Sequence, residues 1–284
     1  MIFLKVDWAP NESLFEIFGI GIRFYSLMFV IAFSYGYYLM KKIYEKENIS
    51  IEYVEPLLLY MVFSTLIGAR LGHVLFYDWA YYQNHLMEIL LPIRESEGSS
   101  MLFGIIKGYK FIGYRGLASH GAVIGILSGI ALYQRKYRVA SWFWILDRLT
   151  LPATIGGAFV RLGNFYNSEI VGKYTNSSFG VVFQNNGERL PRHPAQLYEA
   201  IGYVILFFVL RWLYKQGKTQ TGFLLGVYFT GIFSIRFLVE FVKESQGGFE
   251  KIIPMFSTGQ WLSLPFIFIG VLLMTKALTK TVKS

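Results

Sequence analysis

The sequence predicts an all-α integral membrane protein. Of its 284 residues, 54% are hydrophobic and only 16% are charged, whereas a soluble domain carries about 25% charged residues. Apolar stretches of about 20 residues, the length that crosses a bilayer, recur along the whole chain. These stretches do not alternate in polarity as membrane-spanning strands do, so we expect helices.

About seven transmembrane helices are expected. The predicted spans are residues 18–40, 55–77, 116–133, 142–160, 195–213, 222–243 and 259–275. Lys41 and Lys42 follow the first span rather than precede it. We therefore expect that span to be a permanent anchor and not a cleaved signal sequence.

The distribution of Lys and Arg predicts the orientation of these spans. Twelve of these residues fall within 40 residues in one set of segments, namely 41–53, 134–141, 211–220 and 276–284. Ten fall within 102 residues in the opposite set, namely 1–13, 78–116, 159–193 and 244–258. The positive-inside rule then places the N-terminus outside and the C-terminus in the cytoplasm. Anchoring to anionic lipid accounts for much of the net charge of +9, so we expect no nucleic-acid partner.

The chain reads as one polytopic membrane domain, residues 1–284, with two long outer segments. Residues 78–115 mix aromatic and charged side chains, which predicts an arm at the membrane interface. Residues 173–193 contain a β-like run at Phe179–Phe183 and a turn at Asn185–Gly187. This second segment is expected to form a small extracytoplasmic cap.

The chain contains no cysteine, which excludes a disulfide, a thiolate metal site and a cysteine nucleophile in the chain itself. Any thiol in its chemistry must therefore belong to a substrate. His73 and His85 have no partner at a metal-binding spacing, and we expect neither a metal nor another cofactor.

The densest group of polar residues near an apolar span lies in residues 156–172. Arg161, Asn164, Asn167 and Glu169 follow the fourth span here. A charged side chain at the bilayer centre costs about 2.5–3.5 kcal/mol on insertion scales, so such residues usually mark function.

Among the arginines within predicted spans, Arg236 and Arg70 are further candidates for function. Arg236 and Glu240 are four residues apart and share a helix face. They form either a self-neutralising pair or an arrangement in which Glu240 orients Arg236 to grip an anion. Arg70 lies between Gly68 and Gly72, a spacing that favours close helix packing, so a packing seam and a direct role both stay open.

His120 and Tyr25 complete the group of polar candidates on the outer side. His120, at the start of the third span, is the best candidate base because histidine titrates near neutral pH. Tyr25 has an ordinary explanation as an interfacial aromatic anchor. Together with the arginines, these groups indicate a phosphate-handling site in the outer half of the membrane.

In these residues the chain resembles the prolipoprotein diacylglyceryl transferases. Seven motifs carry the resemblance in the same order along the chain: Gly21–Tyr25, Gly68–Gly72, Ala118–Gly121, Gly157–Gly172, His193–Glu199, Arg236–Phe241 and Gly259–Ser263. The resemblance implies transfer of the diacylglyceryl group of phosphatidylglycerol to the lipobox cysteine in a prolipoprotein signal peptide. It also implies release of glycerol phosphate, membrane-lipid contact and a bacterial cytoplasmic (inner) membrane location, with the active site on the outer side.

The resemblance also implies roles for individual residues. The expected catalytic residues are His120 as base, Arg161 and Arg236 as phosphate-holding cations, and Tyr25 as a hydrogen-bond partner of lipid or thiol. The expected phosphatidylglycerol-binding residues are Arg161, Asn164, Asn167, Glu169, Gly172, Glu240 and Arg70, with Glu169 and Glu240 orienting the arginines. Relatives often have a tyrosine four residues before the second arginine, where this chain has Ile232, and Tyr228 lies one turn earlier.

Three other functions were weighed. Another lipid-headgroup transferase would share the arginines but use a different acceptor. A transporter would spread polar groups through both membrane halves and show paired repeats, which this sequence lacks. A structural scaffold would leave Arg161, Asn164, Asn167 and Glu169 unexplained.

Overall fold

The computed structural model describes residues 6–11, 13–17, 20–101, 105–113, 116–244 and 255–282. The prediction of a mostly helical protein is confirmed. Seven helices of 17 to 25 residues each overlap one predicted span: α1 (Phe24–Lys46), α2 (Val54–Tyr77), α5 (Ser119–Tyr137), α6 (Trp142–Tyr166), α7 (Ala195–Lys215), α8 (Phe223–Val239) and α9 (Thr258–Val282).

Three segments of these helices are long and apolar enough to cross a membrane by length and composition. They are Ile51–Tyr77, Ala195–Lys215 and Thr258–Thr279. Helix α8 is apolar but shorter. The architecture is therefore that of a helical integral membrane protein.

Two predicted span boundaries were wrong. The first span was predicted from residue 18, but strand β3 occupies Ile20–Arg23 and α1 begins at Phe24. Glycine weakens helices, and Gly21 lies in this strand; residues 18 and 19 lie outside the described residues. The sixth span was predicted to reach residue 243, but α8 ends at Val239 and the chain turns back toward residues 171–173.

Short elements join the long helices. The helical ones are η1 (Ile51–Tyr53), α3 (Trp79–Tyr82), α4 (Met87–Leu90) and η2 (Gln184–Asn186). The strands are β1 (Val6–Trp8), β2 (Ser13–Ile17), β3, β4 (Ile93–Met101), β5 (Ile106–Phe111) and β6 (Val181–Phe183). Strand β1 pairs with β6 in parallel, whereas β2–β3 and β4–β5 are antiparallel. These small sheets add to the predicted all-α fold class.

The contacts within the chain divide it into two compact units. The first unit comprises residues 1–48 and 143–284, and the second comprises residues 49–142.

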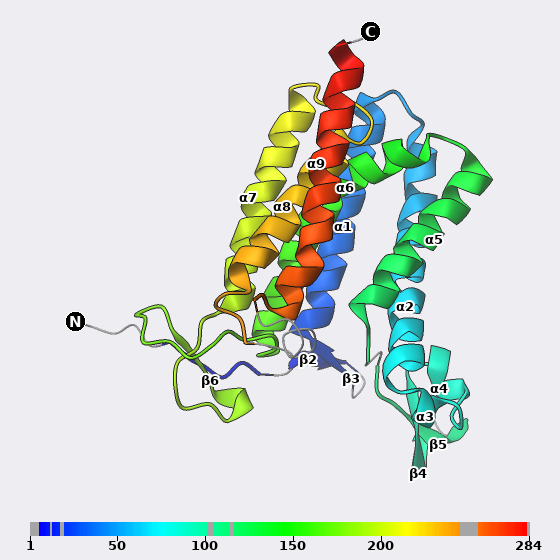
Figure 1. Ribbon diagram of the computed structural model, residues 1–284. Helices are drawn as coiled ribbons and strands as arrows, with labels where there is room; N and C mark the ends of the chain where they lie inside the picture. The colour runs from blue at the N-terminus through cyan, green and yellow to red at the C-terminus, as the bar shows by residue number, and fades with distance from the viewer. Residues whose placement is uncertain are drawn as a thin grey trace. The chain divides into compact units, whose positions relative to one another are not determined.

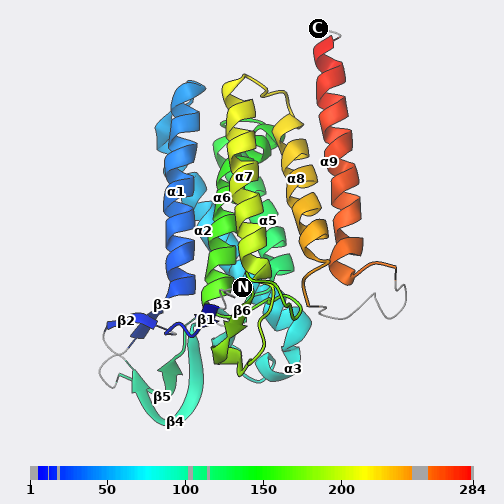
Figure 2. The same ribbon diagram turned by 90° about the vertical axis from the view of Figure 1, so that its left-hand side faces the viewer.

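In the second unit, α2 and α5 lie side by side (Figure 1) because glycines let their backbones approach. A Cβ atom added to Gly68 would lie 2.5 Å from the carbonyl oxygen of Gly121 and 2.7 Å from the Cα of Gly125. The small-residue spacing therefore forms a packing seam. The predicted arm at 78–115 contains α3, α4 and the β4–β5 hairpin, drawn as two arrows in Figure 2.

In the first unit, a polar cluster joins α1, α6 and α7. The carboxylate of Glu47 accepts hydrogen bonds from Arg148 Nε at 3.0 Å, Trp144 Nε1 at 2.7 Å and the Tyr214 hydroxyl at 2.9 Å. Burial alone would raise the pKa of Glu47, but the hydrogen bonds from Arg148 and Trp144 lower it below its ordinary value. Arg148 is therefore neutralised within the fold, as a buried charge requires.

The neighbouring Asp147 ties α6 to the start of α8. Its carboxylate accepts hydrogen bonds from the backbone N–H groups of Gly222 at 2.6 Å and Leu225 at 2.9 Å. A carboxylate at a helix N-terminus satisfies donors that the helix itself leaves free. Helix α9 then runs beside α8 (Figure 2), where Gly226 and Gly270 allow close packing.

Candidate functional site

Arg161, near the C-terminal end of α6, is held by two neighbours. Its Nε forms an ion pair with the carboxylate of Glu199 on α7. Its Nη1 donates a hydrogen bond to Asn164 Oδ1 at 3.0 Å. The side chain of Arg161 is 14% exposed and that of Glu199 is 2% exposed. The guanidinium is thus fixed from two sides in a largely buried position.

Asn164 connects Arg161 to Glu169 through hydrogen bonds. Asn164 Nδ2 donates to Glu169 Oε2 at 3.1 Å, and Asn167 Nδ2 donates to Glu169 Oε1 at 3.2 Å. Gln196 of α7 donates to the backbone carbonyl of Glu169. Glu169 is therefore connected to Arg161 through Asn164, and its role in orienting Arg161 stays a prediction. We call Arg161, Asn164, Glu169, Gln196 and Glu199 the α6–α7 polar network.

Helix α7 supplies a polar stripe that the sequence reasoning missed. Gln196, Glu199 and Tyr203 follow a spacing that places them on one helix face, and all three are at most 3% exposed. Tyr203 interacts electrostatically with Arg161, and its ring lies 3.3 Å from where a Cβ atom would stand at Gly157. Polar residues at this spacing in an apolar helix were the signal that could have found them.

Tyr203 also links the two arginines. Arg236, half-buried on α8, interacts electrostatically with Tyr203 and with Tyr228. Ile232, at the position where relatives often have tyrosine, is buried. It lies one helical turn before Arg236, and Tyr228 lies one turn earlier still, within electrostatic range of Arg236. That Tyr228 substitutes for the tyrosine of the relatives stays a prediction.

Glu240 has an ion-pair partner other than Arg236, and its orientation of Arg236 stays a prediction. Glu240 is the residue that follows α8, and its carboxylate forms an ion pair with Lys243 at 3.4 Å. A Cβ atom at Gly259 would lie 2.6 Å from Glu240 Oε1. Because the helix ends at Val239, Lys243 folds back onto Glu240, which packs against the start of α9.

Tyr25 lies at the same end of the first unit. Its side chain interacts electrostatically with Glu169, Arg161 and Asn164. A Cβ atom at Gly163 would lie 2.7 Å from the Tyr25 ring, so this glycine makes room for it. Tyr25 is therefore part of the site and has more than an anchoring position.

Gly172 lies where three backbone segments meet. It forms a β-bridge with Lys243, and its N–H donates to the carbonyl of His193 at 2.9 Å. A Cβ atom at Gly172 would lie 2.5 Å from that carbonyl oxygen and 2.7 Å from the carbonyl oxygen of Val242. Only glycine fits without a shift of the backbone.

Arg192 fastens the cap segment to Gly172. Its Nη1 donates to the carbonyl of Gly172 at 3.1 Å and to Glu244 Oε2 at 2.8 Å, while its Nε donates to Glu188 Oε1 at 2.9 Å. The hydrogen bond from Arg192 lowers the pKa of Glu188 below its ordinary value. The predicted cap is thus joined to the site by a charged residue.

His120 and Arg70 belong to the second unit. His120 is the second residue of α5 and is exposed. Arg70 is 3% exposed; its Nε donates to the carbonyl of Ile89 at 2.9 Å, and its guanidinium lies 4.7 Å from the centre of the Tyr82 ring. Backbone carbonyls thus satisfy Arg70 within the packing seam, and its role in binding stays a prediction.

The cluster around Arg161 offers cationic and amide donors. Across the described ranges, no group of three His, Asp or Glu side chains is placed to hold a metal ion. A guanidinium fixed by a carboxylate and an amide, beside a second arginine, presents oriented donors to a phosphate.

Comparisons with known proteins agree with this chemistry. The family model described as prolipoprotein diacylglyceryl transferase matches residues 12–276. The phosphatidylglycerol–prolipoprotein diacylglyceryl transferase of Bacteroides fragilis is 44% identical over 275 residues, covering 96% of this chain and 95% of that protein. Enzymes with the same name from Chloroherpeton thalassium (41% identical; 94% and 92% covered) and Tolumonas auensis (40% identical; 94% and 95% covered) are also similar.

Proposed function

The chain belongs to the prolipoprotein diacylglyceryl transferase family, and we propose that it transfers the diacylglyceryl group of phosphatidylglycerol to the lipobox cysteine of prolipoproteins. The cysteine sulfur forms a bond to the glycerol carbon, and the bond from that carbon to the phosphate oxygen breaks. Glycerol phosphate leaves with the electron pair, and the thiol proton passes to a base. This reaction is the first step of lipoprotein maturation.

The observation that carries this proposal is the fixed position of Arg161. Its ion pair with Glu199 and its hydrogen bond to Asn164 hold the guanidinium in one orientation before substrate binds. Donors that are already oriented stabilise charge that develops in a transition state without further reorganisation. Here that charge develops on the departing phosphate.

In this proposal Arg161 and Arg236 both bind the phosphate. Arg161 and Arg236 both lie within electrostatic range of Tyr203, which supports a common anion site. Asn164, Asn167 and Glu169 keep the donors in place, and Tyr25 offers a hydroxyl to the lipid or the thiol. Gly172 and Glu240 shape the wall of the site through their backbone and α9 contacts.

His120 is the base in this proposal. A free thiol has a pKa of about 8.5, so its attack at neutral pH gains from proton removal by a nearby imidazole. Arg70 contributes to headgroup binding from the second unit. The reaction needs no cofactor, because the acceptor sulfur arrives on the polypeptide.

The proposed setting is the bacterial cytoplasmic (inner) membrane. Seven spans, with the N-terminus outside and the C-terminus inside, follow from the distribution of Lys and Arg. This orientation puts the α6–α7 polar network on the outer side, where an exported signal peptide presents its cysteine. The interfacial arm at 78–115 and the cap at 173–193 then lie on that side as well.

Thiol-dependent release of the headgroup tests this proposal. The purified protein is placed in vesicles that contain phosphatidylglycerol with a radiolabelled headgroup, and a lipobox peptide is added. We expect labelled glycerol phosphate to appear only with the cysteine peptide and not with its Cys→Ser variant. Release to another acceptor in the absence of peptide would favour a different lipid-headgroup transferase, whereas transport of intact lipid without release would favour a transporter.

A further inference from the structure

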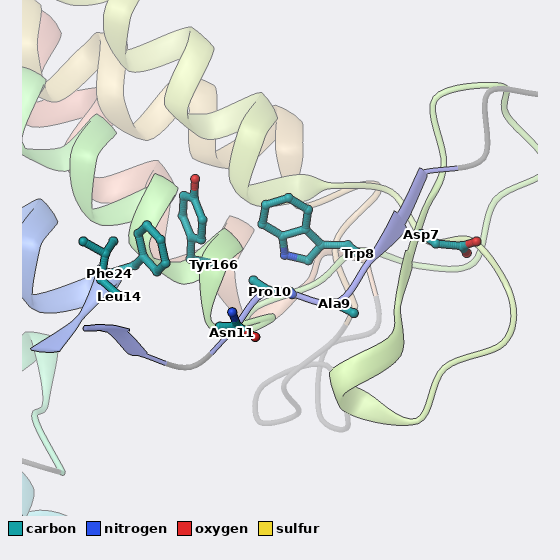
Figure 3. A pocket seen from close by; sticks show the side chains of 8 residues that line it. All are labelled: Asp7, Trp8, Ala9, Pro10, Asn11, Leu14, Phe24 and Tyr166. Atoms are coloured by element: carbon teal, nitrogen blue, oxygen red, sulfur yellow. The ribbon is translucent and has the colours of Figure 1, made fainter. Parts of the chain in front are cut away.

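A cavity of about 430 Å³ opens at the end of α6, outside the α6–α7 polar network. Figure 3 shows its lining side chains, which come from the segment around β1 and from β2, α1 and α6: Asp7, Trp8, Ala9, Pro10, Asn11, Leu14, Phe24 and Tyr166. This volume lies within the range of ligand sites, and the lining combines aromatic and apolar side chains with the polar Asp7 and Asn11.

The walls of the cavity are held in place. Trp8 Nε1 donates to the carbonyl of Phe165 at 3.1 Å. The Phe24 and Tyr166 rings stack with centroids 4.2 Å apart, and Trp8 meets Tyr166 edge-on at 5.3 Å. Asn185 Nδ2 fixes the rim by donating to the carbonyl of Pro10 at 2.9 Å. An aromatic site so anchored is preformed and needs little ordering when a ligand binds.

The charge of the lining residues favours the polypeptide over phosphatidylglycerol as the occupant of the cavity. Among the lining residues that the structure describes, Asp7 is the only charged one and none is Lys or Arg. A phosphodiester placed there would meet a carboxylate without a compensating cation, which is unfavourable. A neutral or cationic polypeptide segment meets no such cost.

The cavity is lined by residues next in the chain to those of the proposed phosphate site. Tyr166 lies in the chain between Asn164 and Asn167, and Phe24 precedes Tyr25. Strand β1 adds a backbone edge, because β6 is its only paired strand in the part of the chain that the structure describes. An extended peptide can pair with such an edge while its side chains enter a neighbouring pocket.

We propose that this cavity binds apolar side chains of the polypeptide substrate beside its acceptor cysteine. The inference rests on the proposed function and assigns a place to the second substrate. Trp8 and Tyr166 make the main contacts to these side chains, because aromatic residues often supply much of the binding free energy in peptide recognition.

Crosslinking tests the binding directly and without turnover. A lipobox peptide with Cys→Ser and a photoreactive leucine beside that position is irradiated with the protein in vesicles of phosphatidylglycerol and phosphatidylethanolamine. We expect crosslinks on residues 8–11 or on Tyr166, reduced about tenfold by Trp8→Ala and unchanged by Trp79→Ala, which alters an exposed tryptophan of the second unit. Crosslinks elsewhere, or equal losses in both variants, would overturn the proposal.

Steady-state kinetics measures the effect of the cavity on KM for the peptide and on KM for phosphatidylglycerol separately. The milder variant Trp8→Phe replaces Trp8→Ala if the alanine variant does not fold. We expect Trp8→Phe to raise KM for the peptide several-fold and Trp8→Ala about tenfold, with kcat and KM for phosphatidylglycerol within twofold of wild type. Asp7→Lys discriminates further, since a lower KM for the lipid in that variant would assign the cavity to the headgroup and contradict peptide binding.

The two proposals can fail separately. Transfer by the wild-type protein with crosslinks outside the cavity contradicts only the cavity assignment. Crosslinks in the cavity without transfer support peptide binding and contradict the proposed reaction.

Discussion

Glu199 on α7 is the carboxylate that pairs with Arg161 on α6. Asn164 occupies another donor of the same guanidinium, and Tyr203 lies one turn further along α7. The position of Arg161 therefore depends on two helices. This dependence turns a static ion pair into a set of measurable expectations.

Glu199→Gln should lower transfer at least tenfold, because it releases Arg161 from its fixed orientation. Loss of one partner from a buried ion pair also destabilises the fold, on the order of 3 kcal/mol. Transfer is measured per folded molecule, after thermal unfolding in detergent has defined the folded fraction.

Glu47→Gln is the matched control for Glu199→Gln. Glu47 pairs with Arg148 in the same unit, away from Arg161, so its loss should reduce stability without changing transfer per folded molecule. Equal activity losses in the two variants would mean that Glu199 acts only through stability.

Gly172→Ala should destabilise the protein by about 1–3 kcal/mol, because its Cβ atom would overlap two backbone carbonyls. A drop in the unfolding temperature is the readout. Gly156→Ala is the control: its Cβ atom would meet nothing closer than 3.6 Å, and alanine favours the helix. An unchanged unfolding temperature for Gly172→Ala would contradict the close approach of the three segments.

His120→Gln should reduce transfer about 10²–10⁴-fold near neutral pH, the range that general base catalysis contributes. The rate of the variant should recover partly as the pH rises toward the thiol pKa, since the substrate then ionises by itself. A pH–rate profile measures this. Near-normal turnover across neutral pH would remove His120 as an obligatory base.

The stability of the cap should decrease in acid. The pKa of Glu188 is lower in the folded protein than its ordinary value of 4.5, because of the hydrogen bond from Arg192. The ionised Glu188 carboxylate therefore contributes fully to the free energy of unfolding above pH 4.5. This contribution is lost as the pH falls through the lower pKa of the folded state. Unfolding temperatures of the wild type and Glu188→Gln should converge as the pH falls below 4.5, and a constant difference would contradict the pairing.

The sequence predicted the long helices well because burial in lipid demands long apolar runs, and each of these helices overlaps a predicted span. It did not predict the β4–β5 hairpin, since the mixed stretch 93–111 lacks a clear period. Gly98 and Gly108, both with positive φ, lie inside the two strands, and the register shifts between Glu95 and Ser100. The sequence named Arg161 and Asn164 from their polarity but missed the pairing with Glu199. Spacing reveals neighbours within one helix, whereas Arg161 and Glu199 meet only when α6 packs against α7.

The ion-pair partner of Glu240 also could not be predicted from spacing within one helix. A spacing of four residues places Glu240 on the helix face of Arg236, and the Glu240 N–H does donate to the Arg236 carbonyl at 3.0 Å. The sequence did not reveal that the Glu240 carboxylate pairs with Lys243, which lies beyond the end of α8. Helix ends are the least certain part of a sequence prediction, because the choice between one more turn and a loop depends on tertiary contacts.

The most direct test of the central claim is the mass of the peptide product. The protein in phosphatidylglycerol vesicles is incubated with a lipobox peptide, and mass spectrometry follows the peptide. We predict a gain of one diacylglyceryl unit on the cysteine, absent with the Cys→Ser peptide and with folded Arg161→Ala protein. An unmodified peptide, with folding and lipid content verified, would contradict transferase activity; a modification that persists in Arg161→Ala would contradict the role of the α6–α7 polar network.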